Sequence, residues 1–206
     1  MSSRVNFLPD ERFLSLRSAL KERLHKMADI LTPENIGGIL DVRIEGVLRD
    51  SFDRVGADEG SLWLLDPEKE HLVIAYNTGA QASEIVGFKQ PVGSGIVSTS
   101  LASEQGFAEN EVYKHELHSR LLDDKLRLTT YAMIVVPFYF LNACRGVISC
   151  VQLFNVRREA DQTVPAGPIP PGFAIEQLNL IKRASLIISD LIDYRLLRVT
   201  VGWDGH

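Results

Sequence analysis

The chain has 206 residues, of which 45% are hydrophobic and 24% charged, as in a globular domain rather than a disordered segment. Its formal net charge of −5 disfavours a broad nucleic-acid-binding surface, since such surfaces need clustered lysine and arginine. Only two cysteines occur, Cys144 and Cys150, which argues against a disulfide scaffold and for a reducing compartment, so we expect a cytoplasmic protein.

Two helices are expected at the start, where no apolar segment of signal-peptide length occurs. From an N-cap at Asp10, apolar residues recur three and four apart and predict a first helix whose narrow stripe suits pairing with another helix. The stripe consists of Phe13, Leu16, Leu20, Leu24, Met27 and Leu31. A second helix is predicted from Thr32-Pro33 to about Val55, ended by Gly56 in a left-handed conformation.

Beyond residue 56 the apolar pattern changes to that of strands. The segments SLWLLD and HLVIAYN flank PEKE and predict a hairpin, and VGFKQPV is a candidate third strand. Helical spacing follows in GIVSTSLASEQG, with an end at Gly106. The polar region 107–130 is expected to hold one helix around residues 115–127.

A second hairpin is predicted from YAMIVVPFYFL and RGVISCVQLFNV, which lack polar alternation. Such strands need cover on both faces, so helices must lie against each side of the sheet. The apolar run 132–141 is too short to span a bilayer, and no membrane partner is expected. Residues 158–172 hold four prolines and predict a loop, and a last helix from about Phe173 to Val199 is apolar nearly all round.

This order of elements resembles the GAF domain. Three strings carry the resemblance: GADEGSLWLLD, PVGSGIVSTSLASEQ and TTYAMIVVPFYFLNACRGVISCVQLFN. The resemblance implies an α/β fold of the α+β type, in which a central antiparallel sheet has the N- and C-terminal helices on one face and short helices over a pocket on the other. It places a GAF-like domain at residues 33–199, an N-terminal extension helix at 1–32 and a tail at 200–206.

Among GAF domains, the sequence most resembles those of cyclic-nucleotide phosphodiesterases, because EVYKHELHSRLLDDKLRLTTYAMIVVP fits their pattern without gaps. Asn155 stands where those domains often have an Asn-Lys pair, and FAIEQ stands where Phe-x-x-Asp-Glu is common. Val156, Glu176 and Gln177 depart from that pattern, so the ion pair that those residues usually make cannot form here.

The Gly93-Ser94-Gly95 turn is neither a dinucleotide fingerprint nor a phosphate loop, because the third glycine and the Gly-Lys-Ser/Thr element are missing. Two interpretations remain open. The glycines serve a tight turn from strand to helix, or the helix start also aims the backbone N–H groups of Ile96 and Val97 at a ligand phosphate or carboxylate. The resemblance implies the second, and it carries the rest of a binding site onto Ser61, Asn77 or Thr78, Tyr113, Arg120, Asp124 and Gln152.

The other candidate metal-binding and catalytic residues do not form complete sites. His115 and His118 would share a helix face but lack a third metal ligand, so no metal and no cofactor is expected. Free methionine-(R)-sulfoxide reductases are built on a GAF domain and use cysteine thiolates, but Cys150 lies inside an apolar strand, where a thiol usually serves packing. No nucleophile triad or catalytic carboxylate pair stands out, and Asp123-Asp124 is interpreted as a solvated face or a helix-loop feature rather than an acid/base pair.

The sequence therefore predicts a regulatory domain, not an enzyme, that binds a small effector, with a cyclic-nucleotide-like molecule as one option. It would act as a homodimer through a helical bundle and pass its signal to an unidentified output protein. Two alternatives stay open: a protein–protein interaction or dimerisation module without ligand, and a reductase.

Overall fold

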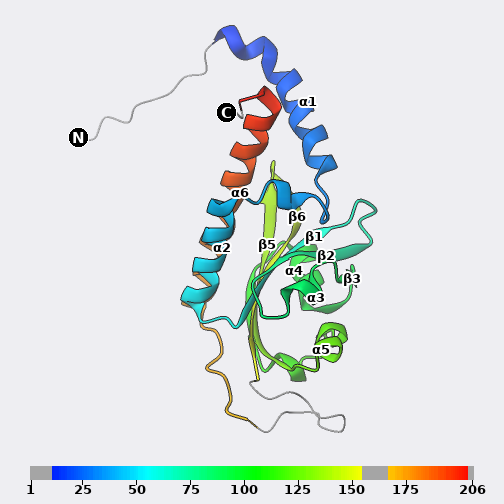
Figure 1. The fold of residues 1–206 in the computed structure, drawn as a ribbon, viewed down its shortest axis with the longest axis vertical. Helices are drawn as coiled ribbons and strands as arrows, with labels where there is room; N and C mark the ends of the chain where they lie inside the picture. The colour runs from blue at the N-terminus through cyan, green and yellow to red at the C-terminus, as the bar shows by residue number, and fades with distance from the viewer. Residues whose placement is uncertain (1–10, 155–166, 204–206) are drawn as a thin grey trace, which may run out of the picture.

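The computed structural model describes residues 11–154 and 167–203. These residues contain one six-stranded antiparallel sheet with helices packed on both faces (Figure 1). The strands lie in the order β3-β2-β1-β6-β5-β4. They are β1 (Glu59–Leu65), β2 (His71–Asn77), β3 (Lys89–Pro91), β4 (Phe107–Asn110), β5 (Thr130–Phe140) and β6 (Ala143–Leu153). Both predicted hairpins and the candidate third strand are confirmed.

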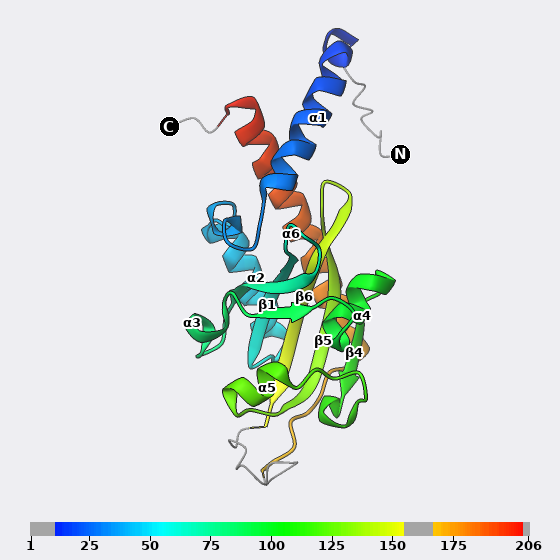
Figure 2. The same cartoon turned by 90° about the vertical axis from the view of Figure 1, so that its right-hand side faces the viewer.

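Two of the three long helices cover one face of the sheet and the short helices lie on the other, whereas the first long helix extends beyond the end of the sheet (Figures 1 and 2). The long helices are α1 (Leu14–Ile30), α2 (Val42–Val55) and α6 (Ile175–Val201). The short ones, α3 (Ala82–Ile85), α4 (Gly95–Ser103) and α5 (Leu121–Leu126), lie on the opposite side. Three 3-10 turns complete the order, at Glu11–Phe13, Ile36–Gly38 and Val112–Lys114. The predicted fold class is confirmed.

Two apolar cores follow from the central hairpin β5–β6, which is buried on both faces. Ile134, Phe138 and Ile148 belong to the core under α2 and α6. Val135 and Val147 point the other way, into the core under the short helices. Side chains of a strand alternate between faces, so a strand that is apolar throughout supplies both cores.

The first helix is confirmed, but within the described residues the N-terminal half of its apolar stripe packs against neither core. Phe13 and Leu16 are exposed, whereas Leu24 and Met27 are partly buried against the core of α2 and α6. Phe13 occupies the N-cap position without a side-chain hydrogen bond. The predicted cap, Asp10, lies outside the described residues.

The second helix begins later than predicted. Asp41, not Thr32, is its N-cap, and the Asp41 carboxylate accepts hydrogen bonds from the backbone N–H groups of Arg43 and Ile44 at 3.0 and 3.1 Å. The glycines at 37 and 38 disfavour a continuous helix, and a 3-10 turn replaces its first part. The predicted end is confirmed, with Gly56 in the left-handed region at φ 69°.

The region 104–130 departs most from the sequence prediction. Helix α4 ends at Ser103, with Glu104 left-handed at φ 53°, so the predicted end at Gly106 is wrong. An edge strand, β4, follows that was not predicted, and the expected helix over 115–127 is only the six residues of α5.

Of the predicted loop, residues 158–166 lie outside the described part of the chain, and 167–172 contain neither helix nor strand. The last helix is found within two residues of its predicted bounds. None of the helices in the described ranges is both long and apolar enough to cross a membrane.

Candidate functional site

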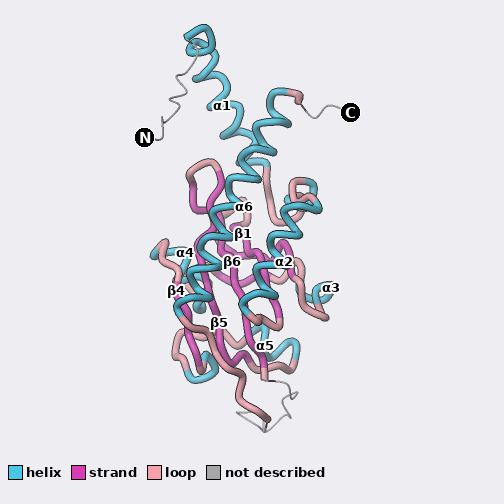
Figure 3. Tube along the Cα trace, turned by 90° about the vertical axis from the view of Figure 1, so that its left-hand side faces the viewer, coloured by secondary structure: helices cyan, strands magenta, loops and turns pink. Residues whose placement is uncertain are grey.

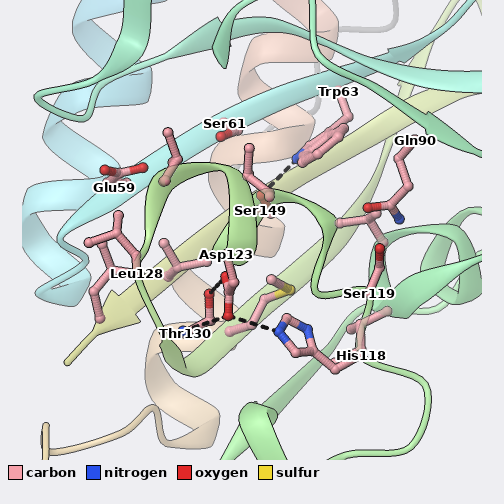
Figure 4. A pocket seen from close by; sticks show the side chains of 17 residues that line it. Glu59, Ser61, Trp63, Gln90, His118, Ser119, Asp123, Leu128, Thr130 and Ser149 are labelled. Atoms are coloured by element: carbon pink, nitrogen blue, oxygen red, sulfur yellow. Dashed lines mark hydrogen bonds and ion pairs between the residues drawn. The ribbon is translucent and has the colours of Figure 1, made fainter. Parts of the chain in front are cut away.

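A cavity of about 60 Å³ lies between the sheet and the short helices α4 and α5 (Figure 4). Its wall combines apolar side chains, among them Leu122, Leu126 and Met133, with polar groups from the sheet and from the segment before α5. One water needs about 10–15 Å³ on a comparable measure, so the space holds only a few water-sized groups.

The floor of the cavity is built by β1 and β6. Alternate residues of β1, Glu59, Ser61 and Trp63, face the cavity, and Ser149 of β6 is the cross-strand neighbour of Ser61. Both serine hydroxyls are buried and each accepts a fixed hydrogen bond, Ser61 from the Asn77 side-chain amide and Ser149 from the Trp63 indole, both at 2.9 Å.

In both bonds the serine oxygen is the acceptor. Each hydroxyl can still donate its own hydrogen to a further acceptor, because a hydroxyl both donates and accepts. Within the described residues neither Ser61 nor Ser149 has an acceptor for it. Two adjacent buried hydroxyls that line one small space can therefore each donate into it. This arrangement suits a guest that carries a carbonyl, carboxylate or hydroxyl oxygen.

The roof of the cavity, formed by α5 and the segment before it, is attached to the sheet by one polar cluster. The Asp123 carboxylate accepts from the backbone N–H and the hydroxyl of Thr130, at 3.0 and 2.8 Å, and lies 3.1 Å from Nε2 of His118. Both members of the His118–Asp123 pair are almost completely buried. The cluster fixes α5 to the first residue of β5 and leaves an imidazole at the cavity wall (Figure 4).

The edge of the cavity carries a partly buried acid, Glu59. Burial raises the pKa of the Glu59 carboxyl above its ordinary value, and the Asn77 side chain opposes that shift. Glu59 therefore takes a proton more readily than an exposed glutamate does.

The Gly93-Ser94-Gly95 turn lies beside two residues that line the cavity, Gln90 and Ser119. Gly93 and Gly95 have φ values of 88° and 80°, so both are in the left-handed region that favours glycine. A Cβ on Gly95 would also lie 2.6 Å from the Gln90 side-chain nitrogen and 2.9 Å from Cβ of Ser119. The turn thus needs glycine both for its backbone and for its packing.

Three of the nine predicted site residues line this cavity, namely Ser61, Ile96 and Val97. The other six, Asn77, Thr78, Tyr113, Arg120, Asp124 and Gln152, are not part of its wall.

The Asn77 side-chain amide donates to the Ser61 hydroxyl at 2.9 Å, and the Thr78 hydroxyl accepts from the Gly60 N–H at 3.0 Å. Tyr113 packs edge-on against Phe154. The Arg120 guanidinium donates to the Tyr113 carbonyl at 3.2 Å.

Asp124 is exposed on α5. Gln152 lies on the opposite face of β6 from Ser149 and joins the Gly56 carbonyl to the Gly172 N–H, at 3.0 and 2.8 Å. The wall residues that sequence reasoning missed include Glu59, Trp63, His118 and Ser149.

Neither cysteine lines the cavity. Cys150 is buried in the core under α2 and α6, and burial raises the pKa of its thiol. Cys144 is half-buried in β6, and burial raises its pKa as well. Both thiols are therefore held in the protonated form, which is the less nucleophilic one.

The predicted helix face carrying His115 and His118 does not exist. His115 ends a 3-10 turn, and His118 lies in the loop before α5. Over residues 11–154 and 167–203 no group of three histidine, cysteine, aspartate or glutamate side chains could hold a metal ion. Of the two interpretations of Asp123-Asp124, the solvated face is wrong for Asp123, which is buried beside the cavity, whereas Asp124 is exposed.

A second, larger hollow of about 460 Å³ lies at the end of α1, between the β1–β2 and β5–β6 turns. Its wall includes Leu31, Leu64, Phe140 and Arg145. The Arg145 guanidinium stacks on Phe140 and contacts the Asp29 carboxylate at 3.4 Å, so it joins the first helix to the central hairpin.

Comparison with known proteins shows the fold. No family profile and no curated protein matches the sequence. Among solved structures, a GAF domain of a phosphoenolpyruvate-protein phosphotransferase from Coxiella burnetii is 14% identical with a TM-score of 0.58, and the match covers 91% of this chain and 96% of that one. The corresponding Acinetobacter domain is 15% identical with a TM-score of 0.54, covering 94% and 98%. A free methionine-R-sulfoxide reductase from Neisseria meningitidis, solved with its substrate, is 15% identical with a TM-score of 0.50, covering 95% and 96%. The chain has the GAF-domain fold.

Proposed function

We propose that this GAF-fold chain is a regulatory domain that binds a small effector in the cavity between the sheet and α4–α5. The paired hydroxyls of Ser61 and Ser149 carry the proposal, because two buried donors without acceptors are costly in a packed interior and are expected to meet a guest or ordered water. The expected partners are that effector, a second copy of the chain and an output protein.

The size of the cavity selects among effectors. Sites for drug-sized molecules measure about 300–1,000 Å³, whereas this cavity measures about 60 Å³. A cyclic nucleotide is too large for the space, and a molecule of a few heavy atoms with one oxygen acceptor fits it best. Larger guests would require α5 to move outward, against the Asp123–Thr130 bonds and the bond from the Lys125 ammonium to the Glu84 carbonyl at 2.9 Å.

The two alternatives from the sequence fare differently. A reductase that attacks its substrate with a thiolate is disfavoured, because no thiol lines the cavity and both thiols have raised pKa values. An interaction module without ligand is the second candidate, and the small volume of the cavity favours it. In that case water would satisfy the two serine hydroxyls.

A ligand panel followed by thermal unfolding tests the sensing proposal. It should contain short carboxylates, amides, alcohols and amino acids, with cAMP and cGMP as oversized members. A true ligand at 100 times its Kd contributes about 2.7 kcal/mol, which corresponds to a rise in Tm of roughly 5–10 °C for a domain of this size.

The matched variants are Ser61→Ala, which removes one cavity hydroxyl, and Ser103→Ala, which removes an exposed one from the end of α4. We expect Ser61→Ala to reduce the shift and Ser103→Ala to preserve it. A panel in which nothing shifts the Tm would leave the interaction module as the better function.

A further inference from the structure

An apolar stripe flanked by two charges runs along the outer side of α6. Arg183, Leu186, Ile187, Asp190 and Tyr194 follow one another at spacings that place them on one helix face. Leu186, Ile187 and Tyr194 are 65%, 51% and 56% exposed. The opposite side of the helix, with Ile181, Ser185, Ile188 and Ile192, is buried against the sheet.

The outer side of α6 lies open in the fold. Figure 3 shows α6 and α2 side by side over the sheet, with α1 reaching only the C-terminal part of α6. Isolated exposed apolar side chains are ordinary, but a stripe of them along a long helix marks a surface that another helix covers.

The two charges favour one direction of pairing. Arg183 and Asp190 are exposed, and within the described residues neither has an ion-pair partner. They stand on either side of Leu186 and Ile187. A two-fold axis through that point sets Arg183 of one copy opposite Asp190 of the other, twice. Parallel pairing would instead oppose like charges at both positions.

The ends of the helix fit the same arrangement. Ile175 is exposed at its first residue, Val201 is exposed at its last, and Trp203 is exposed just beyond the end. Antiparallel pairing about the same axis brings the start of one helix beside the end of the other, so these apolar side chains cover each other within about one turn.

We propose that a second copy of this chain covers α6, with the two helices antiparallel and Arg183 of each copy paired with Asp190 of the other. The apolar stripe supplies the affinity, and the charges set the direction, since exposed ion pairs add little energy by themselves. The pairing does not depend on a ligand in the cavity, so it stands or falls separately from the sensing proposal.

Charge exchange tests the direction. Light scattering and sedimentation of the full chain should show a dimer, and Arg183→Asp or Asp190→Arg alone should weaken its Kd by at least about tenfold. The double variant, R183D with D190R, should recover most of that loss. Asp50 and Arg54, an exposed pair on α2, provide the control, because exchanging their charges should leave the dimer unchanged. A monomeric wild-type chain, or a double variant as weak as the singles, would overturn the proposal.

Cross-linking separates the two directions without relying on affinity. In a Cys144→Ser background, a mixture of Arg183→Cys and Asp190→Cys chains should form a mixed disulfide dimer, whereas neither variant alone should cross-link efficiently. The reverse pattern, with each variant linking to itself, would establish parallel pairing and contradict the proposal. Unchanged circular dichroism of these surface variants controls for misfolding.

Discussion

The Trp63 indole N–H on β1 donates a buried hydrogen bond to the Ser149 hydroxyl on β6 at 2.9 Å. Because Trp63 also packs edge-on against Phe88, the indole is held both by its ring and by its nitrogen. The same bond makes the Ser149 oxygen an acceptor and leaves its hydroxyl hydrogen available to a group in the cavity. Trp63, a residue of the apolar core, thus sets the hydrogen-bonding role of a serine that lines the cavity.

Replacing Ser149 by alanine should leave the Trp63 N–H buried without an acceptor. We expect a loss of about 1–3 kcal/mol in the free energy of unfolding. Urea unfolding followed by the emission of Trp63, in a Trp203→Phe background, measures it. Ser103→Ala is the control, with an expected change within about 0.5 kcal/mol. Equal stabilities of the two serine variants would show that the bond contributes nothing.

Removing the Asp123 carboxylate should release the roof of the cavity. Asp123→Ala leaves the Thr130 N–H and hydroxyl without their acceptor and His118 without its partner. Hydrogen exchange should accelerate over residues 118–130 by at least about tenfold, while the β1–β6 ladder stays protected. Glu116→Ala, a change of a nearby exposed acid, should leave the exchange of this segment nearly unchanged. Uniform acceleration throughout the chain would instead indicate a global loss of stability.

The central hairpin was predictable because its sequence allows one arrangement. Residues 131–141 contain no polar alternation, and an apolar strand of that kind must be covered on both faces. Strand β4 was not predictable in the same way, because FAEN is short and mixed in character. It becomes a strand by pairing with β5, where Phe107 stands opposite Val135 and Asn110 opposite Ala132.

Only the part of the candidate site that lies on strands was predictable, because strand residues alternate between the two faces of the sheet. Alternation from Ser61 along β1 yields Glu59 and Trp63, and the same rule excludes Gln152, which lies an odd number of residues from Ser149. His118 and Asp123 come from an irregular segment, and their approach depends on Thr130 at the start of β5. No local pattern in the sequence encodes that contact.

The Glu59 carboxyl should make stability depend on pH. Burial raises its pKa in the folded chain above the ordinary value of 4.5, so ionisation is less favourable in the folded than in the unfolded state. Any stability from this group is present at low pH and is lost as the pH rises through the folded pKa. Glu59→Gln should therefore gain stability relative to the parent between about pH 4 and pH 7.

Denaturation midpoints at the two pH values measure that gain. Glu68→Gln, which removes an exposed charge from the β1–β2 turn, is the matched control. A Glu59→Gln protein that loses stability relative to the parent as the pH rises would show that the carboxylate is stabilised rather than penalised in the folded chain.

Gly146 should be intolerant of any side chain, because the neighbouring strand β1 approaches it closely. A Cβ at this position would clash with the backbone oxygen of Trp63, and that strand cannot move without breaking its pairing with β6. Gly146→Ala should therefore cost at least about 2 kcal/mol, measured by urea unfolding, or prevent folding altogether. Gly37 offers the matched comparison, since a Cβ there meets nothing within 4 Å. Gly37→Ala should be neutral or stabilise the chain by up to about 1 kcal/mol, because alanine restricts the unfolded state. If the two alanine variants proved equally stable, the close approach of β1 to β6, and with it the geometry of the cavity floor, would be wrong.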